Sequence, residues 1–224
     1  MKDKISLYRK SIHKFINENV NKYMIDKYLN KLVISDHIIS IVALTIISNI
    51  NKKSKKTLHG YYVALIIELL LLDEFLNVKN TMNIIRLIDD NILLLVSTLS
   101  PEKIININCQ CHKILYDKIN ELIVTQGEDK IICISKVAIL LAWVLGCGLL
   151  NKEILNELEI AGNCLGKLIC ISNTFVKENY ESMFDEFIKY KQKFIEIAVT
   201  YNIFSDTMKN IINSFEDKID KIAC

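Results

Sequence analysis

The stretch that decides the fold covers residues 136–181 and reads KVAILLAWVLGCGLLNKEILNELEIAGNCLGKLICISNTFVKENYE. Its first part, residues 139–144, is apolar on every side, and a helix of that kind belongs in the middle of a bundle. Gly146 and Gly148 predict the end of this helix, because glycine takes the left-handed conformation of a helix C-cap at little cost. We therefore expect a buried central helix over residues 136–148, with Trp143 in the core.

A second helix is predicted directly after the first. Asn151 is a suitable N-cap, because its side-chain oxygen can accept a hydrogen bond from a free backbone N–H. Gly162 and Gly166 follow at a spacing of four residues, so they lie one above the other on one helix face. Two glycines placed in this way predict a face that another helix can approach closely.

The whole chain reads as helical. It has 224 residues, of which 51% are hydrophobic, with only six glycines and one proline, and so few helix breakers argue for a mostly helical protein. We expect one all-α bundle, a single domain over residues 1–224, with about nine helices. Outside the deciding stretch, helices are predicted over residues 4–24, 25–34, 38–50, 58–76, 82–99, 102–124, 183–201 and 206–222.

Charge and cysteine content bound the environment and the partners. The net charge of +2 is too small to indicate nucleic acid. Seven cysteines are an odd number and fit reduced thiols in a cytosol. The start MKDKISLYRK lacks an apolar segment of the signal-peptide kind. The longest uncharged apolar stretch, residues 137–150, is shorter than the roughly 20 residues that span a bilayer. We expect a cytoplasmic protein without a transmembrane segment.

The order of these features resembles the trans-isoprenyl diphosphate (polyprenyl) synthases, in which a Lys-Thr-Ala helix precedes a Gly-x-x-x-Gly helix and then Asp-Asp-x-x-Asp. The resemblance covers residues 55–222 and is strongest over residues 128–222. Asn173, Thr174 and Lys177 stand at the three aspartate positions of the second motif. Asn173 is similar to the competence-pheromone isoprenyl transferase branch. The resemblance implies the isoprenoid synthase fold and an isoprenoid diphosphate as ligand.

The resemblance also implies which residues bind substrate. Lys136 matches the lysine of the family's Lys-Thr-Ala, and the second motif contributes Asn173 and Lys177. The family's Gly-Gly-Lys-Arg-x-Arg-Pro, which holds the second substrate's diphosphate, corresponds here to the segment that contains Lys55, Lys56 and His59.

Magnesium is the cofactor that the resemblance implies, with Asp73 or the pair Asp89 and Asp90 as the remnant of the first aspartate motif. A lysine ammonium offers hydrogen-bond donors and no lone pair, so Lys177 cannot ligate Mg²⁺. The second motif differs from three carboxylates by about four charge units, counting two neutral groups and one cation. We therefore predict weak or no magnesium-dependent condensation of allylic and homoallylic diphosphates.

Two other functions stay open. The chain is either a noncatalytic partner subunit of an active prenyl synthase or an unrelated helical interaction protein. The resemblance predicts a homodimer, or a heterodimer with a prenyl synthase, and the leucine-rich residues 63–76 exceed what one partner helix covers.

The remaining metal-ligating and nucleophilic residue types give weaker signals. In Cys109-Gln110-Cys111-His112 the cysteines point to different sides of a helix, so buried structural cysteines are favoured over a zinc site. His13, His37 and His59 have no partner that the sequence identifies, so nucleophilic catalysis has no support.

Overall fold

The computed structural model describes residues 2–20, 36–50, 57–71, 90, 101–146, 148–175 and 180–223. Its helices are α1 (Lys2–Val20), α3 (Ile38–Ile50), α4 (Thr57–Leu71), α6 (Pro101–Val124), α7 (Gly127–Leu145), α8 (Lys152–Thr174), α9 (Tyr180–Thr200) and α10 (Asp206–Ala223). No described residue belongs to a strand, so the all-α prediction is confirmed for this part of the chain. None of its helices combines the length and apolarity that crossing a membrane requires.

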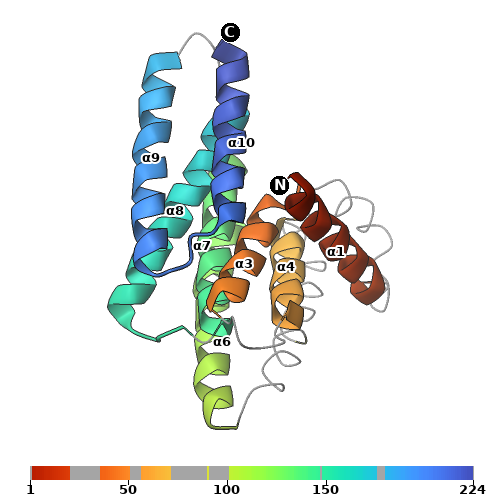
Figure 1. Cartoon of the computed structure of the whole chain (residues 1–224). Helices are drawn as coiled ribbons and strands as arrows, with labels where there is room; N and C mark the ends of the chain where they lie inside the picture. The colour runs from red at the N-terminus through yellow and green to blue at the C-terminus, as the bar shows by residue number, and fades with distance from the viewer. Residues whose placement is uncertain are drawn as a thin grey trace.

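Helix α7 lies at the centre of the bundle (Figure 1). It packs against α8, α3, α6 and α4, and every residue of its stretch 137–145 is buried. Trp143 is only 7% exposed. The expected central helix is confirmed, although it begins nine residues before Lys136, where Glu128 and Asp129 favour the positive end of the helix dipole.

Helices α7 and α8 form an extensive contact, and two glycines make it close. A Cβ atom added at Gly166 would lie 2.5 Å from the Cα of Ile132, and one added at Gly162 would overlap the backbone of Lys136. Since residues 162 and 166 face residues 136 and 132 in reverse order, the two helices run antiparallel. The close approach that the Gly-x-x-x-Gly spacing predicted is confirmed, and its partner is the central helix.

The end of α7 is built differently from the prediction. Gly146 has φ −70°, which is a right-handed conformation open to any residue, so a left-handed C-cap is the wrong reason for this glycine. Gly148 is required by space, because a Cβ atom there would overlap the indole ring of Trp143. The indole Nε1–H donates to the carbonyl oxygen of Leu149 at 3.0 Å, which holds the turn against the ring.

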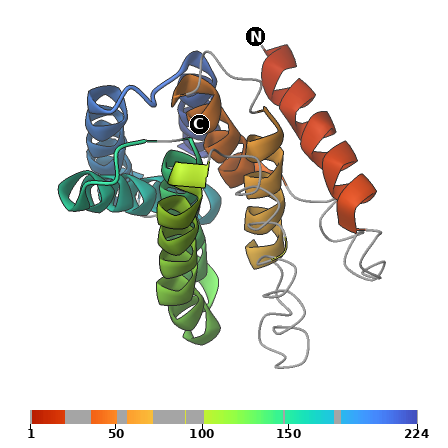
Figure 2. The same ribbon diagram turned by 90° about the horizontal axis from the view of Figure 1, so that it is seen from below.

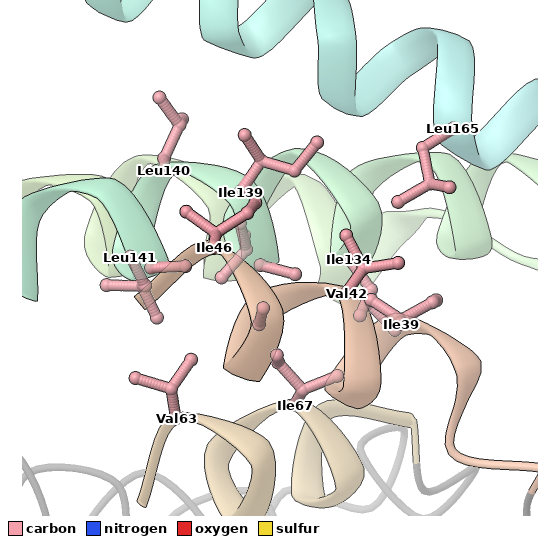
Figure 3. Packing of buried hydrophobic residues seen from close by; sticks show 14 of the residues in the cluster. Ile39, Val42, Ile46, Val63, Ile67, Ile134, Ile139, Leu140, Leu141 and Leu165 are labelled. Carbon is pink, nitrogen blue, oxygen red and sulfur yellow. The ribbon is translucent and has the colours of Figure 1, made fainter. Parts of the chain in front are cut away.

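Helix α4 is covered within a single chain. Its residues 63–70 are each at most 1% exposed, and α4 packs against α3, α7 and α1. Figure 3 shows Val63 and Ile67 of α4 facing Ile39, Val42 and Ile46 of α3, with α7 beyond them. The free apolar face on which the expected dimer partly rested is therefore absent from residues 63–70. Dimerisation itself stays a prediction.

The outer helices are amphipathic and lie on opposite flanks. In Figures 1 and 2, α1 lies beside α4 on one side of the molecule, and α9 lies on the other side. Phe15 of α1 stacks on Tyr61 and meets Tyr62 edge-on, and Lys191 of α9 pairs with Glu216 of α10.

The helix boundaries agree with the sequence prediction to within a few residues. Helix α3 has the predicted bounds, and α6 begins at Pro101, where a proline is expected at the first helical position. The helices predicted over 25–34 and 82–99 lie outside the described residues, apart from helical Asp90.

Candidate functional site

The residues assigned to substrate and metal are only partly described. Lys55, Lys56, Asp73, Asp89 and Lys177 lie outside the described residues, as does the side chain of His59 on α4. The three that remain are Asp90, which is half-buried, Lys136, which is half-buried on α7, and Asn173, which is exposed on α8.

Asn173 lies at the C-terminal end of α8. Its Oδ1 accepts a hydrogen bond from the Nζ of Lys218 on α10 at 2.8 Å. The helix ends at Thr174, and Phe175 has extended backbone angles of φ −58° and ψ 126°. The helical i, i+4 spacing, which would place the first and last positions of the motif on one face, therefore stops before position 177.

Lys136 and Asn173 are not brought together. Lys136 packs beside Gly162, and Asn173 lies eleven residues further along α8 (173 minus 162). At 1.5 Å per residue, the two positions are separated by about 16 Å along the helix axes. One diphosphate head cannot contact both through short side chains across that length.

The metal-ligating residue types are dispersed over the described helices. Among these residues, no group of three His, Cys, Asp or Glu side chains could hold a metal ion. Cys109 is exposed and Cys111 is buried, as the spacing of two residues on a helix predicted. Burial raises the pKa of Cys111 to about 12, so this thiol stays protonated at neutral pH and cannot serve as a thiolate ligand.

A buried polar cluster joins α3 to α4. Glu68 has no exposed surface, and His37 is 4% exposed. The Oε1 atom of Glu68 lies 3.0 Å from the Nδ1 of His37 and accepts a hydrogen bond from Ser40 Oγ at 2.5 Å. His37 has φ +53°, which is uncommon for a side chain other than glycine or asparagine.

The arrangement of this cluster does not suit nucleophilic catalysis. A serine nucleophile needs the histidine as its immediate base, and here the carboxylate of Glu68 lies between Ser40 and His37. The other carboxylate oxygen, Oε2, is buried without a hydrogen-bond partner in the described part of the chain. The cluster thus satisfies a buried glutamate and ties two apolar helices together. Sequence reasoning missed this partner of His37, and a lone glutamate inside an apolar helix was the available signal.

A groove of about 350 Å³ lies between α6, α7 and α8. Its lining combines four apolar side chains with three lysines, two acidic residues and two amides: Ile114, Leu140, Leu150, Leu155, Lys113, Lys118, Lys152, Asp117, Glu159, Gln110 and Asn156. This volume falls within the range of small-molecule sites, which starts at about 300 Å³.

Lys118 is the best-fixed charge in this groove. Its Nζ donates to Glu159 at 2.7 Å and to Glu121 at 3.0 Å. Burial alone lowers the pKa of Lys118, but hydrogen bonds and attraction from Glu159 and Glu121 outweigh this and hold the pKa above its usual value. The ammonium therefore remains charged at neutral pH.

A second groove lies between α8 and α9 and is acidic. Glu153, Glu157 and Glu196 line it together with Tyr201, and its volume is about 540 Å³. Carboxylates alone, with no further feature that points to a ligand, do not define a site. The lysine-containing groove is therefore the stronger candidate.

Comparison with models of protein families, with curated proteins and with solved structures gave no match.

Proposed function

We propose that this chain acts in isoprenoid diphosphate metabolism as a polyprenyl-synthase-like binding protein that does not condense allylic and homoallylic diphosphates. The contact between α7 and α8 supports the likeness in architecture. Helix α7 carries Lys136-Val-Ala within the core, and Gly162 and Gly166 bring α8 against it. These are the elements, in the same order, on which the resemblance rests.

The hydrogen bond between Asn173 and Lys218 carries the proposed loss of condensation. A Mg²⁺ ion needs an anionic or carbonyl oxygen free to face it. At Asn173 the oxygen is neutral, and an ammonium lies 2.8 Å away. A doubly charged ion about 4 Å from that ammonium would be repelled by about 2 kcal/mol even at the dielectric constant of water. The position therefore disfavours a magnesium cluster.

The decisive experiment incubates the protein with farnesyl diphosphate, isopentenyl diphosphate and Mg²⁺ and measures product. We expect none, whereas farnesyl diphosphate binds in calorimetry with EDTA present. Turnover near 1 s⁻¹, the low end of ordinary enzymes, that is abolished by Asp89→Ala or Asp73→Ala would refute the proposal.

A variant pair tests the role of Asn173 directly. In Asn173→Asp/Lys218→Ala, the oxygen becomes anionic and the ammonium is removed, so we expect farnesyl diphosphate binding to become tighter on addition of Mg²⁺. Lys209→Ala, an exposed lysine elsewhere on α10, is the matched control and should bind as the wild type does. Magnesium-dependent binding by the wild-type protein itself would contradict our interpretation of this contact.

A further inference from the structure

We propose that the groove between α6, α7 and α8 binds a small amphiphile with a phosphate or diphosphate head and a short apolar tail. This site rests on the proposed function only for the isoprenoid nature of the tail. Its position follows from the lining residues, and none of the residues that the family resemblance assigned to substrate takes part in it.

Three ammonium groups recognise the head. Lys118 is fixed by Glu159 and Glu121 and is the least exposed of the three, with 16% of its side chain accessible. No described residue pairs with the ammonium of Lys113 or of Lys152, and both side chains are exposed at the groove. Lysine binds phosphate as a mobile point charge, so two unpaired lysines can close on a head that the third orients.

The floor of the groove is apolar. Leu140 of α7 is buried, and Figure 3 shows it pointing away from α3 and α4, opposite to Leu141. Leu155 of α8 and Ile114 of α6 adjoin it, and Leu150 is 43% exposed at the edge. Covering this surface with an alkyl tail removes apolar area from water, which contributes roughly 25 cal/mol per Å². The lining thus fits a molecule with one charged and one apolar end.

The two carboxylates of the groove limit the head to one kind of charge. Glu159 is neutralised by Lys118, so Asp117 is the carboxylate that opposes an anion. Three lysines against two acidic groups leave one excess positive charge. An anionic head is therefore favoured, and removal of the charge of Asp117 should tighten its binding.

Calorimetry on the full chain in EDTA tests the site with defined probes: decyl phosphate, farnesyl diphosphate, decanol, decanoate and inorganic pyrophosphate. We expect decyl phosphate to bind one site per chain, with decanol and pyrophosphate at least about tenfold weaker, because each lacks one end of the amphiphile. Loss of one exposed ion contact costs up to about fivefold in affinity. Lys113→Gln and Lys152→Gln should therefore each raise Kd by about that factor, and the double variant by about 25-fold if the effects add.

Matched variants separate the groove from general charge effects. Lys10→Gln/Lys209→Gln changes the net charge equally on exposed lysines of α1 and α10 and should leave Kd unchanged. Asp117→Asn should lower Kd about threefold. Leu150→Gln should weaken decyl phosphate and leave pyrophosphate unaffected.

The outcomes distinguish the two proposals. An unchanged Kd for decyl phosphate in the double lysine variant would overturn the groove, as would decanoate binding as tightly as decyl phosphate. Farnesyl diphosphate that binds independently of Lys113 and Lys152 would overturn the groove and leave the proposed function standing. Lysine-dependent binding of decyl phosphate without binding of farnesyl diphosphate would support the groove and refute the isoprenoid ligand.

Discussion

Substitution of Gly166 by alanine tests the packing on which the fold depends. The new Cβ would lie 2.5 Å from the Cα of Ile132 and 3.0 Å from its Cγ1. Carbon atoms rest at about 3.5 Å or more, so α7 and α8 must move apart by about 1 Å at this level. The obstructing Cα belongs to the backbone of the central helix and cannot turn aside.

The size of the effect follows from two opposing terms. Overpacking of this kind costs about 1–3 kcal/mol and more where backbone is involved, whereas alanine gains about 1 kcal/mol over glycine in a helix interior. Because the contact is between backbones, we expect a net loss of about 2 kcal/mol. In a chain of this length, the melting temperature should fall by about 4–8 °C.

Thermal unfolding followed by circular dichroism and by the fluorescence of Trp143, the sole tryptophan, measures this loss. Gly60→Ala is the control, because its Cβ would meet only the side chain of Leu44, at 3.1 Å, which can adjust. That variant gains helix propensity as well and should stay within about 1 kcal/mol of the wild type. A Gly166→Ala protein as stable as Gly60→Ala would refute the close backbone approach of α7 and α8.

Three further predictions concern other parts of the chain. His37→Asn, which keeps the left-handed backbone, leaves the buried carboxylate of Glu68 without its cation and should cost about 3 kcal/mol in urea unfolding. Adding Glu68→Gln to it should recover most of this loss; no recovery would refute the pairing. Burial raises the pKa of Cys133 to about 12, so at pH 8 about one thiol in 10⁴ is ionised. Peptide mapping after thiol labelling should therefore find Cys109 modified first, with labelling of Cys133 rising about tenfold per pH unit up to pH 10; equal rates would contradict the burial. Asn151→Ala removes the N-cap of α8, which accepts from the N–H of Glu153 at 2.8 Å, and should lower stability by about 1 kcal/mol; an unchanged melting temperature would argue against the cap.

The sequence was sufficient where one residue type has one structural use. An all-round apolar stretch can only be buried, so residues 137–145 were placed correctly in the core. Asn151 caps α8 as predicted. Gly162 and Gly166 allow the close approach that their spacing indicated.

Prediction failed where several physical reasons favour the same residue. Glycine after a helix suggests a left-handed cap, but Gly148 is present because the indole ring of Trp143 occupies the space beside it. That ring lies five residues earlier in the chain, and its rotamer is set by Leu149 and Tyr201. No local pattern reports such a contact.

The end of α8 shows a second limit. Motif alignment places Asn173 and Lys177 on one helical face, and this holds only if the helix continues. The sequence Asn173-Thr174-Phe175 contains no proline or glycine to mark a stop. The termination at Thr174 comes instead from tertiary packing, since Phe175 is 5% exposed and its ring meets Tyr180 edge-on. A motif read along the chain therefore lost its geometry to a contact five residues further on.

The buried cluster of His37, Ser40 and Glu68 explains what apolar pattern alone leaves open. Helices α3 and α4 are apolar nearly all round, and apolar contacts tolerate many rotations of one helix against another. A carboxylate at 0% exposure tolerates only those in which it is paired, because an unpaired buried charge costs several kcal/mol. His37 and Ser40 both meet the same oxygen of Glu68, so a single rotation of α4 satisfies the pair. We infer that this cluster sets the register of α3 against α4, and the left-handed backbone of His37 is what directs its ring into the core. A histidine 31 residues away from a glutamate (68 minus 37) has no sequence signature, which is why only the structure reveals the partner.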